Sequence, residues 1–332
     1  MSGGRGYSLL LAGLGLLTAA LFVLSLTLGP AAIAFGDSIA ALFSGDGGPL
    51  VLIMQEIRLP RAILGLLTGA TLGLSGAALQ GFLRNPLAEP GLIGVSASAS
   101  LGAVLAIYTG LAAAFPLGLP LAALAGGLAA VFIVQALAGS GGVLTVILAG
   151  VAVSSFAAAM TSLALNLSPN PFAALEIMFW MLGSLTDRSM THVWLAAPFI
   201  LAGWIMLFSL GRALDALTLG ADAAASMGID LNRTRRLAIF GTALSVGAAT
   251  AVAGAIGFVG LVVPHLLRPL TGSLPSRLLP ASALGGASMI LAADILVRFA
   301  APGRDLKLGV LTAIVGAPFF LWLVWKSRRD PL

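Results

Sequence analysis

The chain has 332 residues, of which 59% are hydrophobic and only 9% are charged, and its mean hydropathy is +1.07. This composition excludes a soluble globular domain and indicates a protein that lies in a membrane. The absence of cysteine excludes disulfides, thiol catalysis and cysteine-based metal sites. The net charge of +5 requires no nucleic-acid partner, and the two histidines, His192 and His265, lie far apart in the sequence.

Ten apolar runs follow one another along the chain and predict an all-α, polytopic membrane protein with a single domain over residues 1–332. A helix of about 20 apolar residues crosses a hydrocarbon core of roughly 30 Å. The first run follows Arg5, is too long for the apolar region of a typical signal peptide and lacks a clear cleavage site, so we expect a membrane helix. The runs are 9–29, 61–83, 92–110, 117–138, 145–165, 192–210, 236–256, 257–269, 281–299 and 309–326.

The eighth run, 257–269, is short for a full crossing. Gly257, Gly260 and Pro264 predict an irregular or re-entrant start, which a membrane protein tolerates only where it is buried in protein. The basic residues predict the orientation. If the N-terminus is cytoplasmic, 11 of the 17 Lys and Arg residues lie inside and six lie outside. This excess predicts that both chain ends are cytoplasmic.

Two stretches expected on the cytoplasmic side are more polar than their surroundings. In "RNPLAEPGLIG" (84–94), two prolines and an asparagine predict a turn between the second and third helices, with Arg84 and Glu89 at the aqueous boundary. In "LTLGADAAASMGIDLNRTRR" (217–236), an alanine-rich centre between Gly220 and Gly228 predicts a short helix. Such a helix either packs between two spans or is offered to a cytoplasmic partner.

A weak internal repeat is also present. "GAALQGFLRNP" (76–86) and "GAIGFVGLVVP" (254–264) share a Gly-Ala start and a proline ten residues later. If five spans separate the two copies, they face opposite ways across the membrane. That arrangement predicts an inverted repeat, which is common in transporters.

Four longer stretches carry a resemblance to a known family. They are "RLPRAILGLLTGATLGLSGAALQGFLRNPLAEPGLIGVS" (58–96), "ILAGVAVS" (147–154), "GFVGLVVPHLLR" (257–268) and "LGVLTAIVGAPFFLWLV" (308–324). Together they resemble the permeases of the ABC importers for iron-siderophores, heme and vitamin B12. The resemblance implies the type II importer fold with ten helices per subunit, and it covers nearly the whole chain.

The resemblance also implies the partners of the chain. These are a second permease copy, in most cases identical, a cytoplasmic dimer of ATPase subunits, a soluble binding protein that delivers cargo, and the lipid bilayer. The chain has no P-loop, so it is not expected to be an enzyme itself, and ATP hydrolysis belongs to the separate subunit. No cofactor, metal site or nucleic acid is expected. The implied location is the bacterial cytoplasmic (inner) membrane.

Three sets of site residues are implied by matching positions in the family. The ATPase coupling segment is 212–235, with the contacts Leu219, Gly220, Ala225, Met227 and Gly228. The cytoplasmic gate is Gly142, Val143, Leu144 and Thr145, and the binding-protein docking residues are Arg58, Arg61 and Arg304. The sequence departs from the family at two places: Val143 and Leu144 stand where small hydroxyl residues are frequent, and Lys307 stands where proline is common.

Other polar and sulfur-bearing residues have simpler explanations. Asp294 and Arg298 are four apart on one helix face and are expected to pair with each other. Met178, Met181, Met190 and His192 gather near the expected outer mouth, where either packing or transient contact with heme explains them. His265 is interpreted as structural.

The sequence therefore predicts the permease subunit of an ATP-driven importer of a metal chelate, a ferric siderophore first and heme or cobalamin next. The alternative is an ion-coupled secondary transporter, which an inverted repeat also fits. That alternative requires ionisable groups within the membrane, and Asp294 is the one candidate. An intramembrane enzyme is disfavoured by the lack of cysteine and of any clustered His, Asp and Glu.

Overall fold

The computed structural model describes residues 4–29, 33–45, 47–139, 141–168, 171–300 and 306–327. Over these residues all regular secondary structure is helical. Each predicted run coincides with one helix, so the predicted helix order is confirmed. These helices are α1 (Gly4–Thr27), α4 (Leu59–Phe82), α5 (Val95–Tyr108), α7 (Gly118–Ala138), α8 (Val143–Asn166), α10 (Met190–Phe208), α13 (Leu231–Ala253), α14 (Val259–Leu267), α15 (Pro275–Ala300) and α16 (Leu308–Ser327).

Within the described residues, seven helical stretches are long and apolar enough to cross a membrane by themselves. They are α1, Pro49–Phe82, α7, α8, α10, α13 and α15. Short helices join them: α2 (Phe35–Phe43), α3 (Pro49–Leu52), α6 (Leu111–Ala114), α9 (Pro171–Met181), α11 (Gly211–Leu217) and α12 (Ala221–Ser226), together with the π-helix η1 (Ile53–Arg58) and the 3-10 helices η2 (Pro90–Ile93) and η3 (Pro269–Thr271). Most of these are too short for apolar periodicity to predict.

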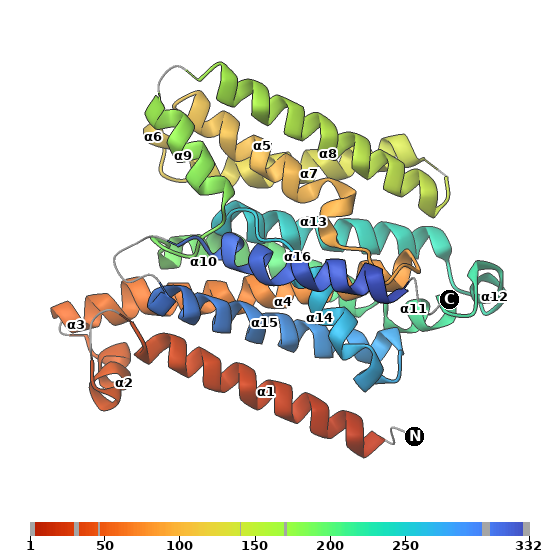
Figure 1. Ribbon diagram of the computed structural model, residues 1–332, viewed down its shortest axis with the longest axis horizontal. Helices are drawn as coiled ribbons and strands as arrows, with labels where there is room; N and C mark the ends of the chain where they lie inside the picture. Colours follow the sequence, from red (N-terminus) through yellow and green to blue (C-terminus); the bar gives the residue numbers. More distant parts are fainter. Residues whose placement is uncertain are drawn as a thin grey trace.

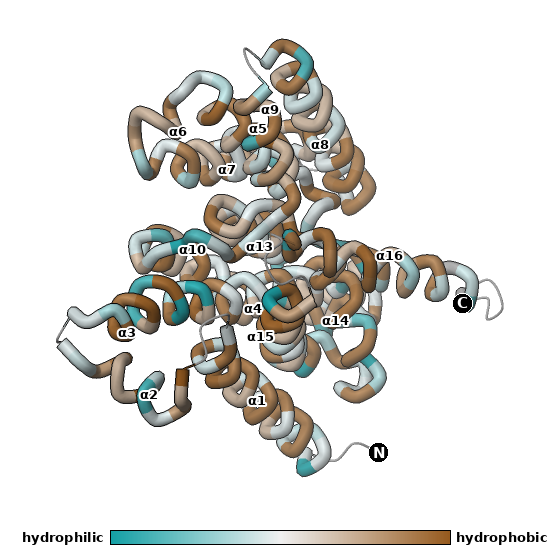
Figure 2. Tube along the Cα trace, turned by 60° about the vertical axis from the view of Figure 1, so that its left-hand side comes forward, coloured by the Kyte–Doolittle hydropathy of each residue, from teal (hydrophilic) through white to brown (hydrophobic). Residues whose placement is uncertain are grey.

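The helices form layers (Figure 1). Helices α5, α7 and α8 make one outer layer, α10 and α13 lie below them, α4 and α15 follow, and α1 covers the far side. Both chain ends and α12 lie at one end of the bundle, while α2, α3, α6 and α9 lie at the opposite end. The hydropathy view shows apolar residues along the lengths of the helices (Figure 2). We call the end with α12 the α12 end and the other end the α9 end.

Small residues allow the central helices to pack closely against each other. A Cβ on Gly69 of α4 would lie 2.3 Å from the Gly286 carbonyl oxygen of α15, and a Cβ on Gly73 would lie 2.0 Å from the Ser282 oxygen. Only glycine permits such backbone approach, as is usual between membrane helices. The backbones of α4 and α15 therefore lie in close contact at the centre of the molecule.

The predicted irregular start of the eighth span is confirmed. Helix α13 ends at Ala253, the chain is not helical over 254–258, and α14 then begins at Val259 behind Phe258, which has a φ of 69°. By contrast, residues 76–82 are helical. The two stretches of the weak repeat thus differ in local structure, and the inverted repeat remains a prediction.

Candidate translocation and coupling sites

The coupling segment 212–235 includes most of α11, all of α12 and the start of α13, and α12 stands away from the bundle (Figure 1). Leu219 is 68% exposed and Met227 is 62% exposed. Gly220 and Gly228 flank α12 with φ angles of 110° and 82°, and neither has an atom within 4 Å of the place of a Cβ. Backbone conformation rather than packing therefore explains these two glycines.

Fixed contacts hold this segment to the bundle. The Asp215 carboxylate accepts a hydrogen bond of 2.8 Å from the Ser276 backbone N–H, which joins α11 to the start of α15. Asp230 caps α13 by accepting from the Arg233 backbone N–H at 2.9 Å, and this hydrogen bond lowers the pKa of Asp230. Ala224 of α12 is fully buried. The segment is thus a supported helix with exposed apolar residues at its flanks.

The predicted gate residues lie at the start of α8. Gly142 is the N-cap residue of α8, and Val143, Leu144 and Thr145 form its first turn. Leu144 is 68% exposed, so nothing described in this chain covers it. The gate role of this turn stays a prediction.

A side chain of α13 reaches this gate turn. Arg235 donates from Nη1 to the Gly141 carbonyl oxygen at 2.6 Å and from Nη2 to the Asn232 side-chain oxygen at 3.3 Å. Its Nε is buried and has no partner within the described part of the chain. Arg235 thereby connects the last residue of the coupling segment directly to the residue before Gly142. Sequence reasoning placed Arg235 in the coupling segment but did not predict its contact with the gate turn, because no local pattern relates positions 94 apart.

Two cavities lie along the non-helical segment 254–258. The first has a volume of about 430 Å³ and apolar walls from the end of α9 and the start of α16, including Met181, Val310 and Ile314. The second has a volume of about 120 Å³ and is lined by Glu89, Gly257 and Phe258, among others. Ala255 lines both cavities, so they adjoin along this segment.

Glu89 differs from its expected position. Arg84 is exposed, as the aqueous boundary requires, but Glu89 turns inward and lines the smaller cavity. Burial raises the pKa of Glu89, and a hydrogen bond from the Phe258 backbone N–H opposes this shift. The turn 84–94 therefore does more than join two helices, because its carboxyl group holds the start of α14.

Backbone contacts join the chain segments beside the larger cavity. The Ser184 N–H donates to the Ala253 oxygen at 2.7 Å, and the Gly309 N–H donates to the Gly183 oxygen at 3.3 Å. A Cβ on Gly254 would lie 2.5 Å from the Trp180 oxygen. Three segments far apart in sequence meet here: the end of α9, the end of α13 and the start of α16.

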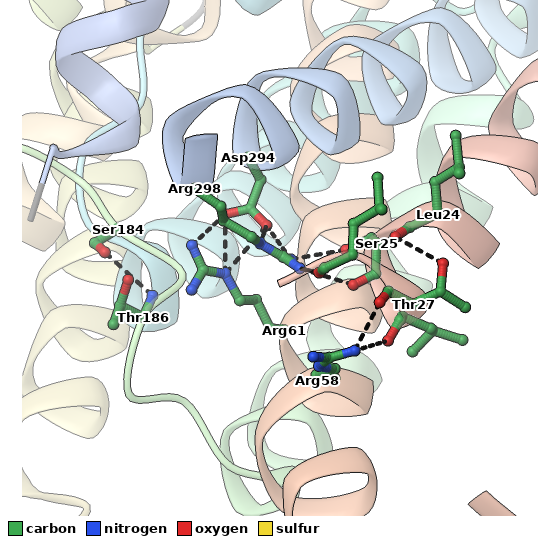
Figure 3. A network of polar contacts seen from close by, with 11 residues as sticks. Leu24, Ser25, Thr27, Arg58, Arg61, Ser184, Thr186, Asp294 and Arg298 are labelled. Atoms are coloured by element: carbon green, nitrogen blue, oxygen red, sulfur yellow. Dashed lines mark hydrogen bonds and ion pairs between the residues drawn. The ribbon is translucent and has the colours of Figure 1, made fainter. Parts of the chain in front are cut away.

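The predicted docking arginines Arg58 and Arg61 lie in a cluster at the α9 end (Figure 3). Asp294 is 1% exposed and accepts from Arg61 Nη2 at 2.8 Å and from Arg298 Nε at 3.1 Å. The expected pairing of Asp294 with Arg298 is confirmed. Arg61 is an additional partner that the sequence analysis did not expect, because α4 and α15 are distant in the chain.

The same arginines hold the end of α1. Arg58 is 5% exposed, and its Nη1 donates to the carbonyl oxygens of Leu26 at 3.0 Å and Thr27 at 2.8 Å. Arg298 Nη1 donates to the Ser25 and Leu28 oxygens at 2.7 and 2.9 Å. Carbonyls at a helix C-terminus lack partners and attract cations, so these contacts cap α1. Arg304 lies outside the described residues, and docking by all three arginines stays a prediction.

The two histidine candidates make local structural contacts. His192 caps α10 through Nδ1, which lies 3.2 Å from the Ser189 backbone nitrogen. The His265 ring packs edge-on against Phe319, with centroids 5.9 Å apart. No group of three or more His, Asp and Glu residues capable of holding a metal occurs in the described ranges. Met178 is 54% exposed, and contact with cargo there remains a prediction.

The sequence of this chain is similar to those of known permeases. The uncharacterised ABC transporter permease protein YvrB of Bacillus subtilis is 40% identical over 300 residues, which cover 89% of this chain and 84% of that protein. The vitamin B12 import system permease protein BtuC of Citrobacter koseri is 39% identical over 320 residues, covering 96% of this chain and 94% of BtuC.

A solved structure also matches. It shows an inward-facing conformation of a metal-chelate type ABC transporter. The two chains are 32% identical in sequence, and the match covers 95% of this chain and 98% of the chain in that structure, with a TM-score of 0.85. This match confirms the importer permease fold that the sequence predicts. The model of the FecCD transport family matches residues 17–326. The chain is therefore a multi-pass membrane protein that belongs to the FecCD transport family.

Proposed function

We propose that the chain is the permease subunit of an ATP-driven importer that moves a metal chelate into the cytoplasm. The observation that carries this proposal is the family match over residues 17–326, together with an exposed, supported helix at the α12 end. Relatives named for vitamin B12 import and a solved metal-chelate type transporter support the cargo class. Within that class we propose a ferric siderophore first, with heme and cobalamin as competing cargoes.

The α12 end is proposed to face the cytoplasm, so that both chain ends are cytoplasmic in a bacterial inner membrane. Leu219, Gly220, Ala225, Met227 and Gly228 then contact an ATPase subunit. Exposed apolar residues on a polar loop support this assignment, because such surface normally meets a partner. The outer partner is a soluble binding protein, and a second permease copy completes the path.

Transport follows from these parts in three steps. Motion of the bound ATPase shifts α12, the Arg235–Gly141 contact transmits the shift to the start of α8, and Val143 and Leu144 move to open or close the path. Cargo passes along a cavity with apolar walls, without a tight binding site there. Affinity for cargo then belongs to the binding protein, and release is not hindered.

The rival function, ion-coupled transport, is disfavoured by the surroundings of Asp294. This carboxylate is 1% exposed and holds two arginines, so it is not placed to bind a passing cation. The two functions separate in proteoliposomes. We expect uptake of a ferric or cobalt chelate only when the ATPase, ATP and the binding protein are present. Uptake by the purified chain alone, driven by an ion gradient, would overturn the proposal.

A further inference from the structure

A polar pocket lies at the α9 end, beside the larger apolar cavity. It has a volume of about 260 Å³ and forms where α9 ends, where the 182–189 loop turns and where α16 begins. Its walls are Glu176, Phe179, Trp180, Ser184, Thr186, Asp187, Arg188 and Lys307. Met181 and Gly309 line the apolar cavity. In the sequence, Met181 directly follows Trp180, and Gly309 lies two residues after Lys307.

Two residues of the pocket lining, Trp180 and Arg188, carry hydrogen-bond donors. Trp180 is 8% exposed, and its indole Nε1–H is buried without a partner within the described part of the chain. A buried donor without an acceptor is unfavourable, so an incoming acceptor would relieve it. Arg188 is half-buried and donates from Nε to the Val252 carbonyl oxygen. Burial lowers the pKa of Arg188, and the neighbouring Asp187 carboxylate opposes this shift, so negative charge beside Arg188 is favourable.

Lysine 307 adds a second cation beside an aromatic wall. Its Nζ lies 5.5 Å from the centroid of the Phe179 ring. The two acids of the pocket, Glu176 and Asp187, are both exposed, so water screens them more than it screens the half-buried Arg188 and Lys307. The pocket is therefore lined by two half-buried cations, by two exposed carboxylates and by Trp180, whose indole N–H has no partner within the described residues.

We propose that this pocket binds an anionic oxygen group of the metal chelate, such as a catecholate or carboxylate, as cargo enters the path. The proposal rests on the proposed import function and names the charge of its substrate. A chelate with one anionic edge in the pocket places its bulk over the neighbouring apolar cavity of about 430 Å³. Lys307, Arg188 and Trp180 thereby favour anionic chelates over neutral ones.

The test uses the full chain in lipid nanodiscs, without ATP or partners. The five tryptophans are replaced by 5-fluorotryptophan, and the Trp180→Phe variant assigns the Trp180 fluorine signal. The probes are an anionic ferric tricatecholate, a neutral ferric trihydroxamate and the diamagnetic gallium form of each. Paramagnetic iron bound in the pocket broadens the Trp180 signal, whereas Trp322 and Trp325, at the other end of α16, serve as internal references.

We expect the ferric tricatecholate to broaden the Trp180 signal selectively and the trihydroxamate to leave it sharp. Lys307→Met should raise the half-maximal concentration about tenfold, as expected for one charge-assisted contact, and Lys307→Arg should restore it. Lys326→Met is the matched control, because Lys326 lies 5.3 Å from the Trp322 ring at the α12 end of the same helix. That variant should bind like the unmodified chain.

Equal broadening by both ferric probes, no selective broadening, or an unchanged midpoint in Lys307→Met would each overturn the proposal. Binding in nanodiscs requires no transport. Its failure therefore leaves the import function standing, while normal binding together with ATP-independent uptake would overturn the import function alone.

Discussion

The two ends of the molecule differ in whether their predicted docking residues have partners within the chain. At the α9 end, Arg58 and Arg61 are largely buried and bonded to α1 and Asp294. At the α12 end, Leu219 and Met227 are exposed and nothing described in the chain covers them. Charge near the membrane boundary is thus satisfied within the chain, whereas apolar surface on a polar loop is left open. The second pattern is the better sign of a docking surface.

The largest expected effect tests the structural role of the arginine cluster. Asp294→Asn removes the charge that holds Arg61 and Arg298, leaving two buried cations without their counter-ion. Breaking a buried ion pair on one side costs about 3–5 kcal/mol. We expect a clear fall in the thermal unfolding midpoint in detergent. Asp222→Asn, the same change at an exposed site on α12, should leave the midpoint unchanged. Equal midpoints for both variants would contradict a structural role for the cluster.

The next effect tests the coupling segment. Met227→Glu places a charge on an exposed apolar site, so folding should be unaffected while association with the ATPase is weakened. We expect uptake to fall by at least tenfold, which corresponds to about 1.4 kcal/mol of lost association. Thermal midpoint and ATP-driven uptake together check this prediction. Normal uptake in both Met227→Glu and Leu219→Glu would remove the segment from the mechanism.

Bulky residues at the flanking glycines give a second test at the same place. Gly220 and Gly228 have positive φ angles, so a side chain there is strained although space is open. This strain is expected to shift α12 rather than to disturb the core. The glycine variants therefore test the position of α12, whereas Met227→Glu tests the chemistry of its exposed surface.

A smaller effect concerns Arg235. Arg235→Gln removes the 2.6 Å contact with the Gly141 oxygen but leaves the exposed face of α12 intact. We expect ATPase association to persist while uptake per ATP hydrolysed falls several-fold. Arg236→Gln, at an exposed neighbouring site, is the matched control. An unchanged ratio of uptake to hydrolysis in Arg235→Gln would show that the gate turn is not driven through this contact.

Sequence reasoning succeeded where a property is local and failed where it depends on distant contacts. Apolar run length located all ten main helices, and the glycines and proline of 257–269 predicted a broken span. It placed Glu89 at the aqueous boundary, because nothing in "LAEPG" shows that the carboxyl group meets Phe258, which is far along the chain. It likewise did not predict that Arg58 and Arg61 have partners within the chain, since these partners lie in α1 and α15, and their docking role stays a prediction.

The docking prediction at the α9 end is sharpened by a charge reversal. Arg304→Glu changes the predicted docking residue that lies outside the described residues, whereas Arg58 and Arg61 are bonded within the cluster. Rim charges act mainly on the association rate and are screened by salt. We expect slower docking of the binding protein at low ionic strength, with the deficit shrinking at high salt. An unaltered association rate at low salt would remove Arg304 from the docking surface.

The smallest effect is a pH dependence in the coupling segment. The Arg233 N–H lowers the pKa of Asp230, so the cap is fully present above the ordinary carboxyl pKa of about 4 and is lost as pH falls through the lowered value. The protection of the amides at the start of α13, measured as the exchange rate relative to the intrinsic rate at the same pH, should therefore fall at acidic pH. Asp230→Asn retains a capping side chain that does not titrate, so its exchange should lack this transition. A transition of the same size in that variant would contradict the assignment.

The most direct test of the central claim uses the absence of cysteine in the chain. A single cysteine at Met227 is cross-linked in proteoliposomes that contain the ATPase and the binding protein, and Asp37→Cys on exposed α2 is the control. The account predicts that Met227→Cys cross-links to the ATPase, that Asp37→Cys does not, and that the cross-link changes ATP-driven chelate uptake. Uptake that proceeds with no cross-link from Met227→Cys to the ATPase would contradict it.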